Sequence, residues 1–101
     1  MTAYLIVRAE VDPSVKSQFD VWYQNEHLPD ALRDFKAISA KRGWSSVEDN
    51  VHIAFYEFPD LAVAEALVSS DILKSFIKEF DRHWEGKVVR TRELVEFSQS
   101  I

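Results

Sequence analysis

Apolar and polar residues alternate at the start of the chain with the period of a β-strand. Between residues 3 and 11 every second position is apolar, and the positions between them are mixed. Two further segments, 35–46 and 51–58, alternate on either side of the turn residues "VEDN", and we expect them to form a pair of antiparallel strands. A last strand is predicted over residues 87–97, after Gly86 has ended the preceding helix.

Helical periodicity fills the intervals between these strands. Asp12 is a good N-cap residue, and the helix that it starts is expected to run to about His27 and to kink or restart at Pro29, which lacks a backbone N–H. A short helix over residues 61–68 follows the dipeptide "PD". The longest predicted helix follows the capping residues "SSD" and carries its apolar residues on one face: Leu73, Phe76, Ile77, Phe80 and Trp84.

The predicted order of elements is β, α, β, β, α, β, with the second helix in two pieces. This order is typical of a ferredoxin-like βαββαβ fold, an α+β domain with a four-stranded antiparallel sheet and helices on one face. Residues 1–101 are expected to form this single domain. The other face is expected to carry enough apolar residues to need a partner, for which a second copy of the chain is the simplest: Tyr4, Ile6, Ala54, Tyr56 and Phe58.

Composition excludes several classes of function. Twelve Lys and Arg against seventeen Asp and Glu give a net charge of −5 without a basic stripe, so nucleic acid is not an expected partner. The absence of cysteine removes disulfides and thiol chemistry. No apolar run approaches the ~20 residues of a membrane span, and no signal peptide follows Met1, so we expect a cytoplasmic protein. The histidine spacing matches no metal-binding pattern, and neither a metal nor another cofactor is expected.

Candidate chemistry is concentrated in "WYQNEHLPD", residues 22–30. On a helical wheel of ~100° per residue, Glu26 falls in the middle of the apolar arc and His27 just outside it. A carboxylate in line with an apolar face has to be paired or hydrogen-bonded, and beside an imidazole it suits general acid–base chemistry. The alternative is that Glu26 and His27 lie beyond the sheet, in water, near the negative end of a helix.

Aromatic residues beside polar ones are candidates for lining a pocket. Trp22 and Tyr23 precede the Glu-His pair, Tyr56 lies on the strand over 51–58, and Trp44 lies near the end of the preceding strand. Most aromatic residues fill a core, but these four are the ones that we expect to contact a ligand.

Other ionisable residues favour simpler interpretations. His52 is expected at a strand end, and His83 is expected to be a solvated partner of Glu79, four residues earlier on the same helix. Four strand arginines suit an anionic ligand, but we expect them to be surface charges or ion-pair partners across a dimer: Arg8, Arg42, Arg90 and Arg92.

Two motifs make the chain resemble a known family, the EthD-like group of the dimeric α/β-barrel superfamily. The pattern W-Y-x-x-E-H-x-P occurs within "FDVWYQNEHLPDALRDF", and Y-E-F occurs within "HIAFYEFPDLAVAEAL". The resemblance spans roughly residues 4–97, and its specific part is the helix motif. It implies a ferredoxin-like protomer that dimerises through its sheet, with His27 beside a cavity between helix and sheet. The segment "RDFKA" replaces the glycine- and proline-rich connection that is usual in the group.

Members of the superfamily include cofactor-free monooxygenases, cyclases and isomerases of cyclic or aromatic molecules, so the resemblance leaves two functions open. In the first, the protein is a cofactor-free enzyme in which His27 is the general acid or base, Glu26 orients or charges it, and Tyr23 and Tyr56 donate phenolic hydrogen bonds. In the second, it is a non-catalytic homodimer that binds a small ligand or a protein. Haem binding through His27 is a third, weaker possibility. Fold alone does not choose between them.

Overall fold

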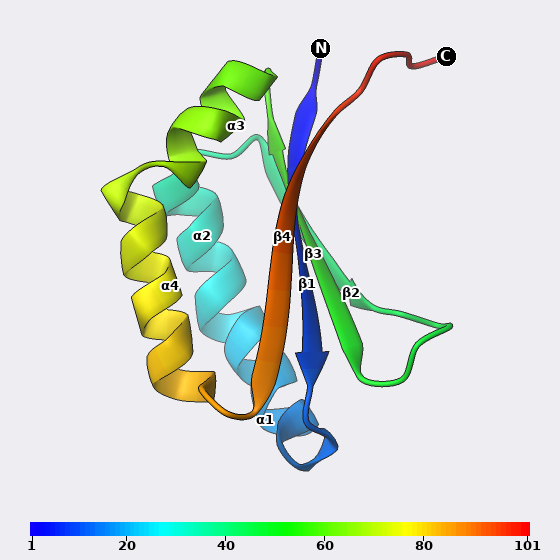
Figure 1. Cartoon of the computed structure of the whole chain (residues 1–101), viewed down its shortest axis with the longest axis vertical. Coiled ribbons are helices and arrows are strands. Elements are labelled where there is room, and N and C mark those ends of the chain that lie inside the picture. Colours follow the sequence, from blue (N-terminus) through cyan, green and yellow to red (C-terminus); the bar gives the residue numbers. More distant parts are fainter.

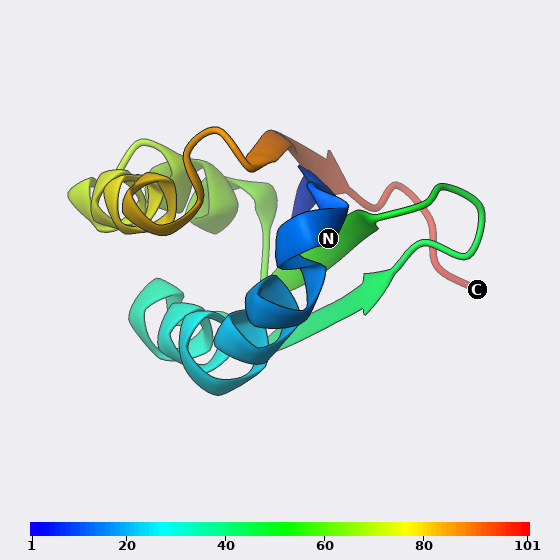
Figure 2. The ribbon, with the colours of Figure 1, turned by 90° about the horizontal axis from the view of Figure 1, so that it is seen from below.

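Four antiparallel strands form one sheet in the order β2-β3-β1-β4 in the computed structural model, which describes all residues from Met1 to Ile101 (Figure 1). The strands are β1 (Ala3–Val11), β2 (Ser39–Trp44), β3 (Val51–Phe58) and β4 (Val88–Glu96). The helices α1 (Lys16–Trp22), α2 (Leu28–Phe35), α3 (Leu61–Val68) and α4 (Asp71–Trp84) cover one face of the sheet (Figure 2). The predicted α+β ferredoxin-like fold is confirmed.

Capping residues set the helix boundaries as the sequence predicts. The Asp12 carboxylate accepts a hydrogen bond from the backbone N–H of Ser14 and starts the 3-10 turn η1 (Pro13–Val15) that leads into α1. Asp60 caps α3 in the same way, through the N–H of Val63. Gly86, just after α4, has a φ of 82°, a left-handed conformation that glycine adopts without strain.

The predicted break before Pro29 is a π-helical turn, η2 (Tyr23–His27), between α1 and α2. The backbone N–H of Leu28 donates to the carbonyl of Tyr23, five residues earlier, instead of four as in an α-helix. The chain then continues as α2 to Phe35, although the alternation over 35–46 predicts a strand from Phe35 onward. The strand begins only at Ser39, because Phe35 turns into the core while Lys36, with a φ of 54°, ends the helix.

The core lies between the helices and one face of the sheet. The odd-numbered residues of β1 from Ala3 to Val11 point into it, as predicted. Ala54, Tyr56 and Phe58 also point into it, so their expected place on the open face is wrong. The register pairs Ala54 with Val7 in neighbouring strands, and directly paired residues share a face.

The open face of the sheet carries a different set of residues from the one expected. Tyr4 and Ile6 of β1 lie on it as predicted, and Ile53 and Phe55 of β3 take the places expected for the even-numbered residues of that strand. Val95 of β4 pairs with Tyr4 and completes the patch.

None of the helices combines the length and apolar composition that a membrane span requires.

Candidate functional site

A small cavity of about 30 Å³ lies between the sheet and the helices η2, α2 and α4. Most of its wall is apolar or aromatic. The backbone of α4 packs near α2 and α3, and side chains fill the space between α4 and the sheet. The polar groups in the wall come from three separate parts of the chain: Tyr23, His27, Tyr56, Arg90 and Arg92.

Two tyrosines meet in the wall of this cavity. The hydroxyl of Tyr23, from η2, lies 2.9 Å from that of Tyr56, from β3, and both side chains are buried. Burial raises the pKa of Tyr23 to about 12 and that of Tyr56 well above its ordinary value, so both are neutral phenols at pH 7. One hydroxyl donates to the other, and the accepting hydroxyl keeps its own hydrogen available for a ligand.

His27 lies on the same wall, among aromatic rings. Its imidazole stacks on Trp22 with ring centroids 4.6 Å apart and meets the edge of Tyr23 at 4.7 Å. Burial, with a smaller contribution from the positive charge of Arg90, lowers the pKa of His27 to about 3. The imidazole is therefore neutral at pH 7. Its ring nitrogens form no hydrogen bond with the protein and remain available to a ligand.

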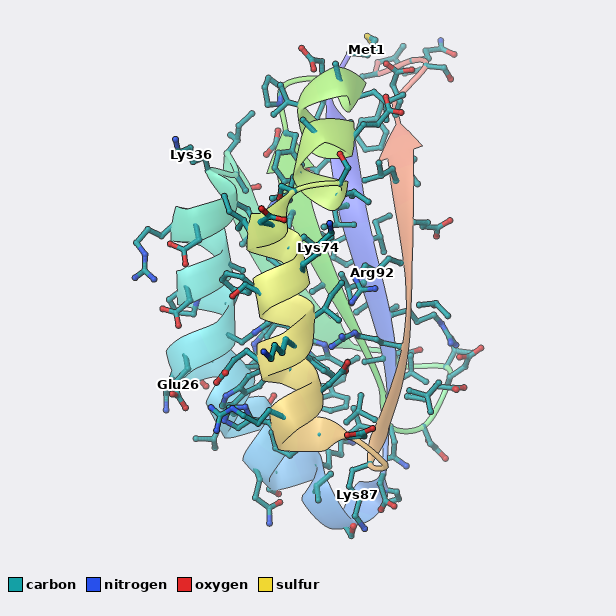
Figure 3. All side chains as sticks on the ribbon, turned by 60° about the vertical axis from the view of Figure 1, so that its left-hand side comes forward. Met1, Glu26, Lys36, Lys74, Lys87 and Arg92 are labelled. Atoms are coloured by element: carbon teal, nitrogen blue, oxygen red, sulfur yellow. The ribbon has the colours of Figure 1, made fainter.

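Glu26 points the other way, which corrects its predicted place on the apolar face. It is exposed and lines an outer groove of about 190 Å³, together with His27, Asp30, Phe76 and Glu79. Figure 3 shows Glu26 on the side of the helices away from the sheet. A wheel of ~100° per residue overestimates the rotation through a π-helical turn, so Glu26 lags behind the apolar arc and His27 moves into it.

Trp44 and His52 belong to a separate, partly buried hydrogen-bond network rather than to the cavity. The Asp20 carboxylate accepts hydrogen bonds from the Trp44 indole at 2.9 Å and from Arg42 at 2.8 Å. Arg42 Nη1 also lies 3.3 Å from His52 Nε2. Because a guanidinium only donates, Nε2 accepts and the proton of the neutral imidazole is on Nδ1.

His52 lies near the start of β3, as expected, but it is buried in the core. Its side chain is 1% exposed, and its ring centroid lies 4.4 Å from that of Tyr23, on β3 among the core aromatics. Burial, followed by the charge of Arg42, lowers the pKa of His52 to about 4. His83 lies as predicted on the exposed side of α4, with Nδ1 3.5 Å from a carboxylate oxygen of Glu79.

Arg90 and Arg92, on β4, extend the polar wall of the cavity toward solvent. Arg90 lies over the ring of Phe80 at 3.8 Å and donates to the Asp81 carboxylate at 3.1 Å. Arg92 forms no ion pair or hydrogen bond, and Figure 3 shows it in the space between α4 and β4. Within the protomer, Arg90 thus has an ion-pair partner and Arg92 has none.

The sequence pattern allows an anionic ligand for these two arginines but does not place them in the cavity. A signal is nevertheless present, because Arg90 and Arg92 alternate in phase with Val88 and Leu94, the apolar residues of the same strand. Charged residues on the core face of a strand are candidates for binding a ligand. Sequence reasoning misses Phe35 as well, because it predicts a strand at that position.

The lining residues and the volume of the cavity limit which ligands it can hold. No group of three or more His, Cys, Asp or Glu side chains is arranged to hold a metal ion. A volume of about 30 Å³ accommodates a water molecule or two, whereas a single aromatic ring needs on the order of 150 Å³. Even a one-ring ligand therefore requires side chains to move, and a porphyrin, which is several times larger again, requires a far greater displacement.

Several solved structures of other proteins share this fold. An ethyl tert-butyl ether d (EthD) family protein from Bacillus halodurans is 20% identical, with a TM-score of 0.73 over 96% of this chain and 99% of that chain. HapK from Hahella chejuensis is 14% identical, with a TM-score of 0.70 over 97% and 94%. A variant of SnoaB, a cofactor-independent oxygenase from Streptomyces nogalater, is 10% identical, with a TM-score of 0.68 over 99% and 96%.

These likenesses establish the fold, and an EthD family protein is among the structural neighbours, as the sequence motifs imply. Comparison of the sequence with models of protein families and with curated proteins finds no match. At such low identities a shared fold does not carry a shared reaction. The chemistry of this chain therefore has to be argued from its own cavity.

Proposed function

We propose that the protein binds a small aromatic or cyclic molecule in the cavity between helices and sheet, and that His27 accepts a proton from it without a cofactor. The observation that carries this proposal is the neutral imidazole of His27, which has no hydrogen-bond partner in the protein and faces a cavity beside the Tyr23–Tyr56 pair. His27 is half-buried, so its ring is held by aromatic contacts while its unpartnered nitrogens stay accessible to a ligand.

The groups around the cavity have complementary roles in such a step. A planar ligand gains dispersion and stacking contacts with the aromatic wall. The free hydroxyl hydrogen of the tyrosine pair suits a carbonyl or phenolic oxygen of the ligand, and Arg90 offsets negative charge that develops when His27 removes a proton. Enolisation, cyclisation and oxygenation all begin with this kind of proton removal. SnoaB, a cofactor-independent oxygenase, supports the idea of a cofactor-free site on this fold, although that activity belongs to SnoaB.

Ligand entry requires the cavity to expand. The side chains best placed to move are those between α4 and β4, because Phe76 and Ile77 are only half-buried and Arg92 is exposed. α4 reaches the sheet through side chains rather than close backbone packing, so a small outward shift opens space without breaking a strand ladder.

A second function, ligand binding without turnover, is favoured by one observation. An imidazole with a pKa of about 3 is a weak base at pH 7, far from the value that suits general base catalysis. A bound anion raises that pKa, and catalysis requires it to do so. The two functions therefore differ in whether His27 becomes protonated when a ligand is bound.

The test is a screen of single-ring and two-ring phenols, enols and carboxylates by thermal shift, followed by turnover assays of the ligands that stabilise the protein. We expect the His27→Gln variant to stay folded, to bind the ligands and to lose at least about 100-fold in turnover. Glu79→Gln, in the outer groove, is the matched control. Full turnover by His27→Gln contradicts the catalytic part, and failure of every ligand to bind contradicts the proposal as a whole.

We also propose that a second copy of the chain covers the open face of the sheet. Tyr4, Ile6, Ile53 and Phe55 form a half-exposed apolar patch there, and a two-fold axis needs only one self-complementary surface. Sedimentation should show a dimer that Phe55→Glu dissociates, while Val21→Glu, an exposed apolar position on α1, leaves it intact. A monomeric wild-type protein at micromolar concentration contradicts this assignment.

A further inference from the structure

Electrostatic charge is distributed unevenly around His27. The protein carries a net charge of −5, yet no carboxylate lines the inner cavity, whose only charged residues are Arg90 and Arg92. The outer groove on the other side of the His27 ring is lined by three carboxylates, from Glu26, Asp30 and Glu79. The inner cavity is thus a positive site in an acidic protein, and the imidazole separates it from a negative groove.

The two arginines differ in their neighbours. The Arg90 side chain is only 10% exposed and already has the Asp81 carboxylate and the carbonyl of Ile77 as acceptors. Arg92 has neither an ion pair nor a hydrogen bond, although burial lowers its pKa from the ordinary value. Because Arg92 is exposed at the edge of the cavity and its donors have no partner in the protein, they are free to bind a ligand.

The two arginines lie at different depths below the protein surface. Arg92 is exposed and lies in the space between α4 and β4 (Figure 3), while Arg90, two residues away on the same face of β4, lies deeper against Phe80. The tyrosine hydroxyls and His27 line the same cavity. An anionic group at the mouth would place an attached ring against the aromatic wall and its far edge near His27.

We infer that the ligand of this cavity is an anion, an aromatic or cyclic molecule with a carboxylate, phenolate or enolate oxygen that binds the unpaired guanidinium of Arg92. The inference rests on the proposed function, because it names the class of molecule that the same cavity takes. Guanidinium and carboxylate or phenolate oxygens form short charge-assisted hydrogen bonds, which are roughly twice as strong as neutral ones. Arg90 adds positive charge behind Arg92, while the Asp81 carboxylate and the carbonyl of Ile77 already accept from its Nη2.

Benzoate and benzamide test the inference, because they have the same ring and nearly the same shape but differ in charge at pH 7. The readout is the NMR shift of the His27 Cε1–H resonance, assigned with His27→Gln, as each compound is added at fixed ionic strength. We expect benzoate to bind about tenfold more tightly than benzamide. Arg92→Gln should abolish this preference, and Arg92→Lys should retain part of it.

Arg33→Gln is the matched control, since it removes the same charge from an exposed position on α2. It should leave the ratio of the two affinities unchanged, because surface charges are screened over about 10 Å at 0.1 M salt. Equal binding of benzoate and benzamide near His27, or a preference for benzoate that survives Arg92→Gln, overturns the inference and leaves the proposed function standing. If neither compound shifts the His27 resonance at millimolar concentration, both the inference and the proposed function are wrong for single-ring ligands, and the cavity is a packing feature.

Discussion

His27 and His52 both lie among aromatic side chains, but only His52 has a hydrogen-bond partner in the protein. Each imidazole packs against Tyr23, with ring centroids 4.7 Å and 4.4 Å away, and burial lowers the pKa of each, to about 3 and about 4. His52 accepts a hydrogen bond from Arg42, which Asp20 holds in place. His27 has no such partner and lies on the wall of a cavity.

A shifted pKa alone therefore does not identify a functional site. Structural networks perturb titration as strongly as active sites do. What separates the two residues is the hydrogen bonding of their rings, because Nε2 of His52 accepts from Arg42, whereas neither ring nitrogen of His27 has a partner in the protein. The inventory of hydrogen bonds is therefore a sharper guide here than the titration behaviour.

The largest expected effect concerns both histidines together. Both have folded-state pKa values below the unfolded value of ~6.5, so the unfolded chain takes up protons that the folded chain does not, and stability falls as pH decreases below about 6.5. We expect urea denaturation to show a loss on the order of 3 kcal/mol between pH 7 and pH 5. His27→Gln and His52→Gln should each remove about half of this dependence. A stability that is flat over this range would show that the two imidazoles are solvated.

Truncation at pH 7 should distinguish the two histidines. His52→Ala leaves a cavity among core aromatics and deprives Arg42 of an acceptor, so we expect it to lower the free energy of unfolding by about 2–3 kcal/mol. His27→Ala breaks no hydrogen bond within the protein and should cost about 1 kcal/mol. Chemical denaturation of both variants provides the measurement. Equal losses would mean that His27 is as much a structural residue as His52.

The tyrosine pair between the two histidines should show strong coupling. Tyr23→Phe or Tyr56→Phe removes one hydroxyl and leaves the other buried without its partner, which should cost about 1–2 kcal/mol. The double Phe variant should cost less than the sum, with a coupling of about 1 kcal/mol in a double-mutant cycle. Additive losses would show that the hydroxyls already bond to water in the cavity instead of to each other.

The smallest effect is expected at Glu26. Because its side chain lies in the outer groove and is exposed, Glu26→Gln should change ligand affinity by less than about twofold and stability by less than about 0.5 kcal/mol. Thermal shift and the binding titration of the cavity ligand measure both. A tenfold loss of affinity would restore the role that the helical wheel predicts for this carboxylate.

Local patterns in the sequence predict most of the fold. Period-two alternation predicts β1 and β3 with the boundaries that the structure has, and the caps Asp12 and Asp60 start their helices as expected. The exception is α2, because the alternation places its last residue, Phe35, in a strand. The helix is short and contains Pro29 in its first turn, so no repeated pattern marks it.

The site is less predictable because it depends on features that local patterns do not carry. The π-helical turn exchanges the expected orientations of Glu26 and His27, and it depends on accommodating Pro29 within a longer packed helix. The pairing of Tyr56 with Leu5 in the sheet decides which face of β3 is buried. The Asp20 contacts of Arg42 and Trp44 join residues more than twenty positions apart, which only the tertiary fold brings together.

The most direct test of the central claim is to follow both imidazole resonances of one sample during titration with a phenol that stabilises the protein. The account predicts that the His27 signals shift with the binding curve while those of His52 stay nearly unchanged, because only His27 faces the ligand. Movement of the His52 signals alone, with those of His27 unchanged, would place the ligand elsewhere and contradict the assignment of this cavity as the functional site.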